Sequence, residues 1–161
     1  SMGFEQPRLL SLTALTDSNH QALPSAMNNL DGEIPEEIQN LHRLELLSMS
    51  FNGGLTGPLQ PGLEKLDHLK DLELQYCSLS GSIPDWIGNL RKLTNLVLGN
   101  DLLTGQLPDK IFKLTDLELL GLDDNTFEGD LAPFGRLSKL ESIRRGAYGR
   151  ARRQLVKDGR T

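Results

Sequence analysis

Leucines recur through the middle of the chain in the order Leu-x-x-Leu-x-Leu, with the same spacing in four consecutive segments. The apolar positions of these segments are Leu44, Leu47 and Met49, then Leu69, Leu72 and Leu74, then Leu93, Leu96 and Leu98, and then Leu117, Leu120 and Leu122. In each segment the last two apolar residues are two positions apart, so they point to the same side of a short strand. The pattern therefore predicts four short β-strands, each burying one apolar row.

A glycine accompanies each leucine segment at a nearly constant interval. The glycines are Gly32, Gly57, Gly81, Gly105 and Gly129, which are 25, 24, 24 and 24 residues apart, and each is followed two residues later by Ile or Leu. One such unit cannot bury its apolar row alone, whereas stacked units pair their strands in parallel and share a continuous core. The sequence therefore predicts a solenoid of about five repeat units.

A polar residue is expected at the bend that follows each strand. The third position after the last core leucine holds Asn52, Cys77, Asp101 and Asn125, and Asn28 stands one unit earlier. A side-chain oxygen at such a bend can accept hydrogen bonds from backbone amides. Cys77 is the member that departs from this pattern.

These features resemble the plant-type subclass of leucine-rich repeats, whose consensus runs LxxLxLxxNxLxGxIPxxIGNLxx. The segment LSGSIPDWIGNL at 79–90 matches that consensus closely, and the resemblance covers about residues 28–143. It implies an α/β leucine-rich-repeat solenoid of about five 24-residue repeats. A parallel β-sheet is expected on the concave face, and short 3-10 or irregular turns on the convex face.

The chain divides into three expected parts. Residues 1–27 fit the repeat poorly, and we interpret them as an N-terminal cap, in which 1–3 have the look of a cleaved tag and about 23–28 read as a degenerate first strand. Leucines at 9, 10, 12 and 15 suit the covering of the open end of the core better than a separate binding helix. Residues 28–143 are the leucine-rich repeats, and 144–161 form a basic C-terminal cap or tail. No signal peptide is expected, because no basic region precedes an apolar one.

Charge separates the tail from the rest of the chain. The formal net charge is −5, yet 144–161 hold seven Lys or Arg against one acid. A basic tail is typical of a nucleic-acid or membrane-surface contact. This tail lacks a motif of specific recognition, so we favour a cap, a linker or a tag remnant and do not expect a nucleic-acid partner. No apolar run approaches the about 20 residues of a membrane span.

Catalytic and metal-binding motifs are not found in the sequence. The histidines at 20, 42 and 68 occupy different positions of their units, and none has a cysteine or carboxylate at ligand spacing. Phosphate loops, nucleophile elbows and zinc-protease motifs are absent from the sequence. We therefore expect no enzyme activity, no cofactor and no metal.

The strand positions between the core leucines are the candidate binding surface. Stacking in register places them in three columns: Ser48, Glu73, Val97, Gly121 and Arg144; Ser50, Gln75, Gly99 and Asp123; Phe51, Tyr76, Asn100 and Asp124. Because neighbouring strands lie about 4.8 Å apart, Phe51 and Tyr76 should be adjacent rings, with acids toward the C-terminal units. The predicted partner-binding residues are Phe51, Glu73, Gln75, Tyr76, Val97, Asn100, Asp123 and Asp124. The alternative is that these are solvated strand positions.

An aromatic anchor beside acidic residues suits a protein or peptide with apolar and basic character. We therefore predict a monomeric, non-catalytic protein-interaction scaffold. The resemblance implies two alternatives: the ligand-recognition or targeting domain of a larger receptor kinase or microbial effector, and an inhibitor of a secreted cell-wall hydrolase. It also implies an extracellular location. The single cysteine and the absence of an Asn-x-Ser/Thr sequon instead favour an intracellular or microbial protein.

Overall fold

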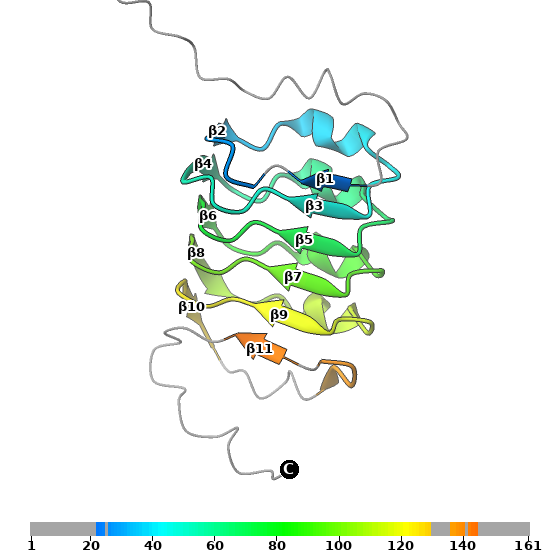
Figure 1. Ribbon diagram of the computed structural model, residues 1–161. Coiled ribbons are helices and arrows are strands. Elements are labelled where there is room, and N and C mark those ends of the chain that lie inside the picture. Colours follow the sequence, from blue (N-terminus) through cyan, green and yellow to red (C-terminus); the bar gives the residue numbers. More distant parts are fainter. Residues whose placement is uncertain (1–21, 25, 130–135, 141, 145–161) are drawn as a thin grey trace, which may run out of the picture.

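The computed structural model describes residues 22–24, 26–129, 136–140 and 142–144, which stack as successive units of one solenoid (Figure 1). Among the described residues, the first four units each contribute a strand to one sheet, a strand to a second sheet and a short 3-10 helix. Most of the expected N-terminal cap and all of the basic tail after 144 lie outside the described residues. Their roles remain predictions.

Six short strands form the sheet that faces the viewer in Figure 1, and this sheet lines the concave side. They are β1 (Ala22–Pro24), β3 (Leu46–Ser48), β5 (Asp71–Glu73), β7 (Asn95–Val97), β9 (Leu119–Gly121) and β11 (Ser142–Arg144). All of them pair in parallel in sequence order. The sheet predicted from the leucine spacing is confirmed, and β1 is the degenerate first strand.

A second parallel sheet, which the leucine pattern did not predict, lies along the left edge of Figure 1. Its strands are β2 (Asp31–Glu33), β4 (Gly54–Gly57), β6 (Ser78–Gly81), β8 (Leu102–Gln106) and β10 (Thr126–Glu128). The recurring glycine lies in or next to these strands and adopts a positive φ, for example 80° at Gly57 and Gly81. Glycine takes this conformation without steric cost, which explains why the interval of the glycines is kept.

In the part of the chain that the structure describes, four 3-10 helices lie on the convex side, as the sequence predicted. They are η2 (Glu36–Asn40), η3 (Pro61–Lys65), η4 (Asp85–Asn89) and η5 (Asp109–Lys113). Three of them follow a proline with extended ψ, at Pro35, Pro84 and Pro108. The fixed φ of proline suits this entry to a helix. In η3 the proline comes later relative to the helix, because Pro61 is itself the first helical residue.

Leucine rows fill the space between the two sheets and the helices. Side chains with no measurable exposure include Leu47, Leu72, Leu96 and Leu120, one from each of four successive units. These are the inward positions of the strands, so the residues that alternate with them are left on the concave face. The core therefore fixes which side chains a partner can meet.

The bend after each strand is held by the predicted polar position. Asn52 Oδ1 accepts hydrogen bonds from the amides of Asn28 and Leu30, at 2.9 and 3.0 Å, while its Nδ2 donates to Met49 O at 2.7 Å. Asn125 bonds the backbone in a similar way, accepting from Leu103 N at 2.9 Å. The predicted role of this position in binding backbone amides is confirmed at both asparagines.

Candidate functional site

The first predicted column of the concave face exists in the structure. The strand registers pair Ser48 with Glu73, Glu73 with Val97, and Val97 with Gly121, and β11 adds Arg144 beside Gly121. Glu73 is half-buried, whereas Val97 is only 4% exposed. Val97 therefore offers little surface to a partner, although it lies where the sequence placed it.

Backbone pairing continues beyond the ends of the strands and aligns the other two columns. Phe51 N donates to Gln75 O at 2.9 Å, Tyr76 N donates to Gly99 O at 2.9 Å, and Asn100 N donates to Asp123 O at 2.7 Å. These bonds hold successive units in the register that the repeat spacing predicted. We call the outermost column, which consists of Met27, Phe51, Tyr76, Asn100 and Asp124, the rim column.

Two aromatic rings of the rim column are stacked. The ring centroids of Phe51 and Tyr76 are 4.7 Å apart and the ring planes differ by 10°. Their separation matches the spacing of neighbouring strands, as expected from the sequence. The two residues remain 43% and 46% exposed, which is unusual for side chains of this size. The stacked pair is thus an apolar surface without a covering element among the described residues.

Met27 extends this apolar surface by one unit, and it was not among the residues predicted from the sequence. Met27 N donates to Ser50 O at 3.1 Å, so Met27 stands beside Phe51 in the rim column, and it is 72% exposed. Its position 24 residues before Phe51 was the available signal. The leucine pattern is weak in that first unit, so the alignment of Met27 with Phe51 was not recognised.

All members of the rim column adopt a left-handed backbone. Their φ values are 60° at Met27, 62° at Phe51, 57° at Tyr76, 57° at Asn100 and 51° at Asp124. Asparagine and aspartate tolerate this region, whereas a bulky residue there is strained by about 1–3 kcal/mol. The N-terminal half of the column therefore carries large apolar side chains at positions whose backbone favours Asn, Asp or Gly.

The C-terminal half of the site is acidic. Asn100 Nδ2 donates to Asp123 Oδ2 at 3.2 Å, while Asp123 Oδ1 is buried and has no hydrogen-bond partner in the described part of the chain. The carboxylate lies over Gly99, because a Cβ built on that glycine would stand 2.6 Å from Oδ1. Asp124 is exposed at the end of the rim column and Gln75 is half-buried beside Gly99. The predicted acids thus lie in the second unit after Tyr76, with Gly99 and Asn100 between them and the ring.

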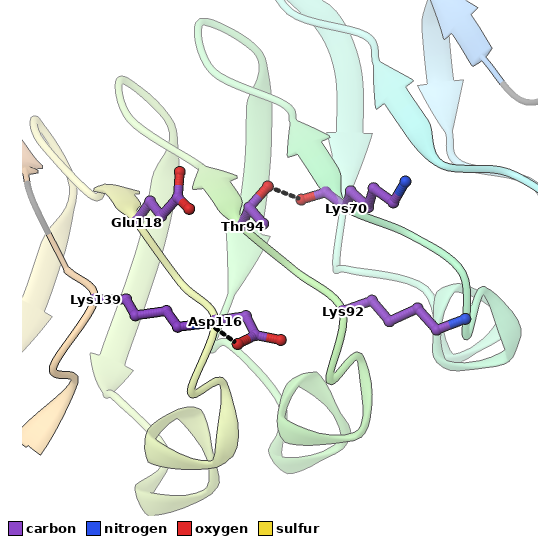
Figure 2. A pocket seen from close by; sticks show the side chains of 6 residues that line it. All are labelled: Lys70, Lys92, Thr94, Asp116, Glu118 and Lys139. Atoms are coloured by element: carbon purple, nitrogen blue, oxygen red, sulfur yellow. Dashed lines mark hydrogen bonds and ion pairs between the residues drawn. The ribbon is translucent and has the colours of Figure 1, made fainter.

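The opposite rim, at the start of the strands, holds a shallow depression of about 340 Å³ lined by Lys70, Lys92, Thr94, Asp116, Glu118 and Lys139. Figure 2 shows Lys139 directed at Asp116, while Lys70 and Lys92 extend toward the preceding units. Lys139 Nζ lies 2.6 Å from Asp116 Oδ1, and Asp116 raises the pKa of Lys139 through that hydrogen bond. Exposed ion pairs contribute little to the free energy of folding. Since this rim lacks an apolar anchor, it is the weaker candidate.

Neither a metal-binding cluster nor a membrane-spanning helix occurs among the described residues. No group of three His, Cys, Asp or Glu side chains among them is placed to hold a metal ion. Within the same part of the chain, no helix has the length and apolar character needed to cross a membrane.

Comparisons with known proteins agree with the repeat geometry. The sequence profile of the Leucine Rich Repeat family matches residues 68–90. Receptor-like protein 39 of Arabidopsis thaliana is 33% identical over 120 residues, which are 72% of this chain and 13% of that protein. The chain therefore spans about an eighth of the length of this relative.

Two solved structures share the fold. The first is the ectodomain of the plant membrane receptor kinase GASSHO1/SCHENGEN3 from Arabidopsis thaliana in complex with CASPARIAN STRIP INTEGRITY FACTOR 2, with a TM-score of 0.71, 31% identity and coverage of 80% of this chain and 16% of that one. The second is the plant peptide hormone receptor RGFR1 in complex with RGF2, with a TM-score of 0.71, 35% identity and coverage of 74% and 19%. Together with the strand order, the glycine interval and the asparagine bonds, these matches identify the chain as a member of the plant-type leucine-rich repeat family.

Proposed function

We propose that the chain is a non-catalytic interaction domain that binds a peptide or protein along its rim column and the adjoining concave face. The observation that carries this proposal is the stacked pair of Phe51 and Tyr76, which is exposed on a backbone conformation that disfavours such residues. Strained positions of this kind concentrate at functional sites. Large aromatic side chains are also the residues that most often dominate binding energy.

Charge defines the partner more closely. The apolar half of the rim column, Met27 to Tyr76, passes directly into Asn100 and the acids Asp123 and Asp124. Glu73 adds a further half-buried acid on the concave face. A ligand with an apolar group and nearby basic residues complements this surface in shape and charge. We propose that the domain binds such a ligand as a monomer.

The larger protein and its location are part of the proposal. Both solved neighbours are plant receptors in complex with a named partner, and one is described as a peptide hormone receptor. This chain spans less than a fifth of either. We propose that it is the ligand-recognition segment of a larger plant receptor-like protein and acts outside the cell. The ectodomain neighbour supports this over the intracellular or microbial interpretation favoured by the single cysteine.

Selection of peptide ligands tests the proposal. Displayed random peptides are selected on the folded domain, and the affinity of the best is measured for wild type and for a Phe51→Asn/Tyr76→Asn variant. Asparagine suits the left-handed backbone, so the variant keeps its fold while losing both rings. We expect the affinity of the variant to be at least tenfold weaker, because a loss of about 1.4 kcal/mol of binding free energy raises the dissociation constant tenfold.

Leu102→Asn provides the matched control, because Leu102 is a 61% exposed apolar residue on the second sheet. It should bind the selected peptides as wild type does. Equal affinity of wild type and the double variant would contradict the proposed site. Loss of binding in the control as well would mean that the peptides recognise general apolar exposure.

A further inference from the structure

We propose that the rim column contains a subsite for one arginine side chain of the partner, between the ring of Tyr76 and the carboxylate of Asp123. This inference rests on the proposed function and specifies the chemistry of the ligand. It is built from an exposed aromatic ring, an incompletely bonded carboxylate and a glycine that lets this carboxylate reach back toward the ring.

The open face belongs to Tyr76. One face of its ring stacks on Phe51, and the near-parallel planes mean that the other face is turned along the column toward Asn100. Phe51 and Tyr76 have ring neighbours at one strand spacing, but the next position holds a short amide. Tyr76 is 46% exposed. A flat cation can therefore continue the stack at the level of the third unit, because an aromatic face attracts positive charge.

The carboxylate of Asp123 reaches back to that same level. It lies over Gly99, whose built Cβ would stand 2.6 Å from Oδ1, and it accepts a 3.2 Å bond from Asn100 Nδ2. Gly99 is the partner of Tyr76 in the backbone ladder. Any residue larger than glycine would displace the carboxylate. Gly99 thus lets the carboxylate of Asp123 lie over the strand that neighbours Tyr76.

The bonding of Asp123 is incomplete. Its Oδ1 is buried with no hydrogen-bond partner within the described ranges, and its Oδ2 has the single long bond from Asn100. A partly desolvated carboxylate gains most from a charged donor, because water compensates it poorly. Oδ2 therefore retains accepting capacity that the bond from Asn100 does not use.

Arginine suits both the ring of Tyr76 and the carboxylate of Asp123 better than lysine does. A guanidinium is flat, so it stacks on Tyr76 while its edge donates hydrogen bonds to Asp123. Neighbouring strands are about 4.8 Å apart, so a guanidinium stacked on Tyr76 would lie near the level of the third unit, to which the carboxylate of Asp123 reaches. An ammonium group has no plane to stack and binds as a point charge.

Titration with small molecules that each carry one side chain tests the subsite. N-acetyl-arginine methylamide, its citrulline analogue and its lysine analogue are titrated into the folded chain while the Tyr76 ring and Gly99 amide signals are followed by NMR. Citrulline has the shape of arginine without the charge. We expect saturable shifts with the arginine probe and at least threefold weaker binding of both analogues.

Two variants separate the contributions. Asp123→Asn should reduce the affinity for the arginine probe at least threefold and abolish its advantage over citrulline. Tyr76→Asn leaves the carboxylate in place and should abolish the advantage of arginine over lysine. Asp116→Asn, on the opposite rim of the same unit, is the control and should bind as wild type does.

The outcomes distinguish this inference from the proposed function. Equal binding of the arginine and citrulline probes, or unchanged binding by Asp123→Asn, would overturn the arginine subsite while peptides selected on Phe51 and Tyr76 still support the function. Arginine binding as expected, with no selected peptide that depends on the two rings, would support the subsite and overturn the larger proposal.

Discussion

Asp101→Asn is the substitution whose effect the structure specifies best. Asp101 takes the bend position that Asn52 and Asn125 hold in other units, and it is 7% exposed. Its Oδ1 accepts a hydrogen bond from Leu79 N at 3.1 Å, but Oδ2 is buried and, among the residues described, has no partner. Burial raises the pKa of Asp101 to about 7 from its ordinary 3.8. We therefore expect an amide to stabilise this position at neutral and alkaline pH.

The magnitude follows from that pKa. The folded chain binds the proton more tightly than the unfolded chain, so stability is greatest below the ordinary pKa of aspartate, falls as pH rises toward 7, and then levels off. About 3 pH units at about 1.4 kcal/mol each give an upper limit of about 4 kcal/mol. Relaxation and water reduce this, and we expect Asp101→Asn to gain about 1–3 kcal/mol at pH 8. The amide also supplies a donor, as Asn125 Nδ2 does to Leu98 O.

Urea unfolding at pH 8 and pH 5 measures this effect, with the fluorescence of the single tryptophan as the probe. The gain of Asp101→Asn over wild type should shrink by at least about 1 kcal/mol at pH 5, where the native carboxyl is protonated. Asp109→Asn, an exposed acid at the start of η5, is the control and should change little at either pH. An equal gain at both pH values, or none at pH 8, would refute the account of Asp101 as a buried carboxyl in an amide position.

Three further changes test packing, thiol accessibility and backbone strain. Gly88→Ala should lower the free energy of unfolding by at least about 2 kcal/mol, because its Cβ would stand 2.2 Å from Lys110 O. Gly53→Ala is the control: a Cβ there has nothing within 4 Å, so the free energy of unfolding should change by less than about 1 kcal/mol. Comparable losses in the two variants would contradict this packing argument. The thiol of Cys77 should resist alkylation until the chain unfolds, since burial raises its pKa to about 11, and rapid labelling of the native chain would contradict that. Phe51→Asn should leave thermal stability equal or higher, because Asn relieves the strain at φ 62°, and a lowered Tm would show that ring stacking outweighs it.

The sequence was sufficient to predict the concave sheet and its columns. Leucines two positions apart specify which face of each strand is buried, and the constant repeat length specifies which residues of successive units are neighbours. The one longer interval, 25 residues between Gly32 and Gly57, does not disturb this register, because Phe51 and Tyr76 still pair through the backbone with the units that follow them. The adjacency of the two rings therefore follows from the spacing of the repeats.

The second sheet was not predictable in the same way. Its strands contain only three to five residues, and each has one or no buried apolar side chain, such as Leu55 in β4 and Leu79 in β6. A segment with at most one apolar residue shows no alternation and cannot be told from a turn. The recurring glycines were the signal, but their interval shows only that a special backbone conformation recurs, not that the preceding residues pair as a sheet.

Exposure within the predicted site also required the structure. Val97 and Glu73 occupy equivalent positions, yet Val97 is buried because it leans toward Gly121, where a built Cβ would stand 3.1 Å from Val97 Cγ1. Because Gly121 has no side chain, the side chain of Val97 can pack against the backbone of the neighbouring strand and is buried. Such effects depend on pairs of units, so the pattern within one unit does not reveal them.

The backbone conformation and the side chains of the rim column together bear on function. Asn100 and Asp124 suit the left-handed backbone that every member adopts, so local preference alone would place similar residues throughout. Phe51 and Tyr76 instead retain large rings, which are strained locally and exposed to water, and neither property helps the fold. The residues at the Asn100 and Asp124 end of the column suit the local backbone conformation, whereas those at the Phe51 and Tyr76 end do not. The aromatic end is therefore under a requirement other than folding. The proposed binding of a partner at the aromatic end would meet that requirement.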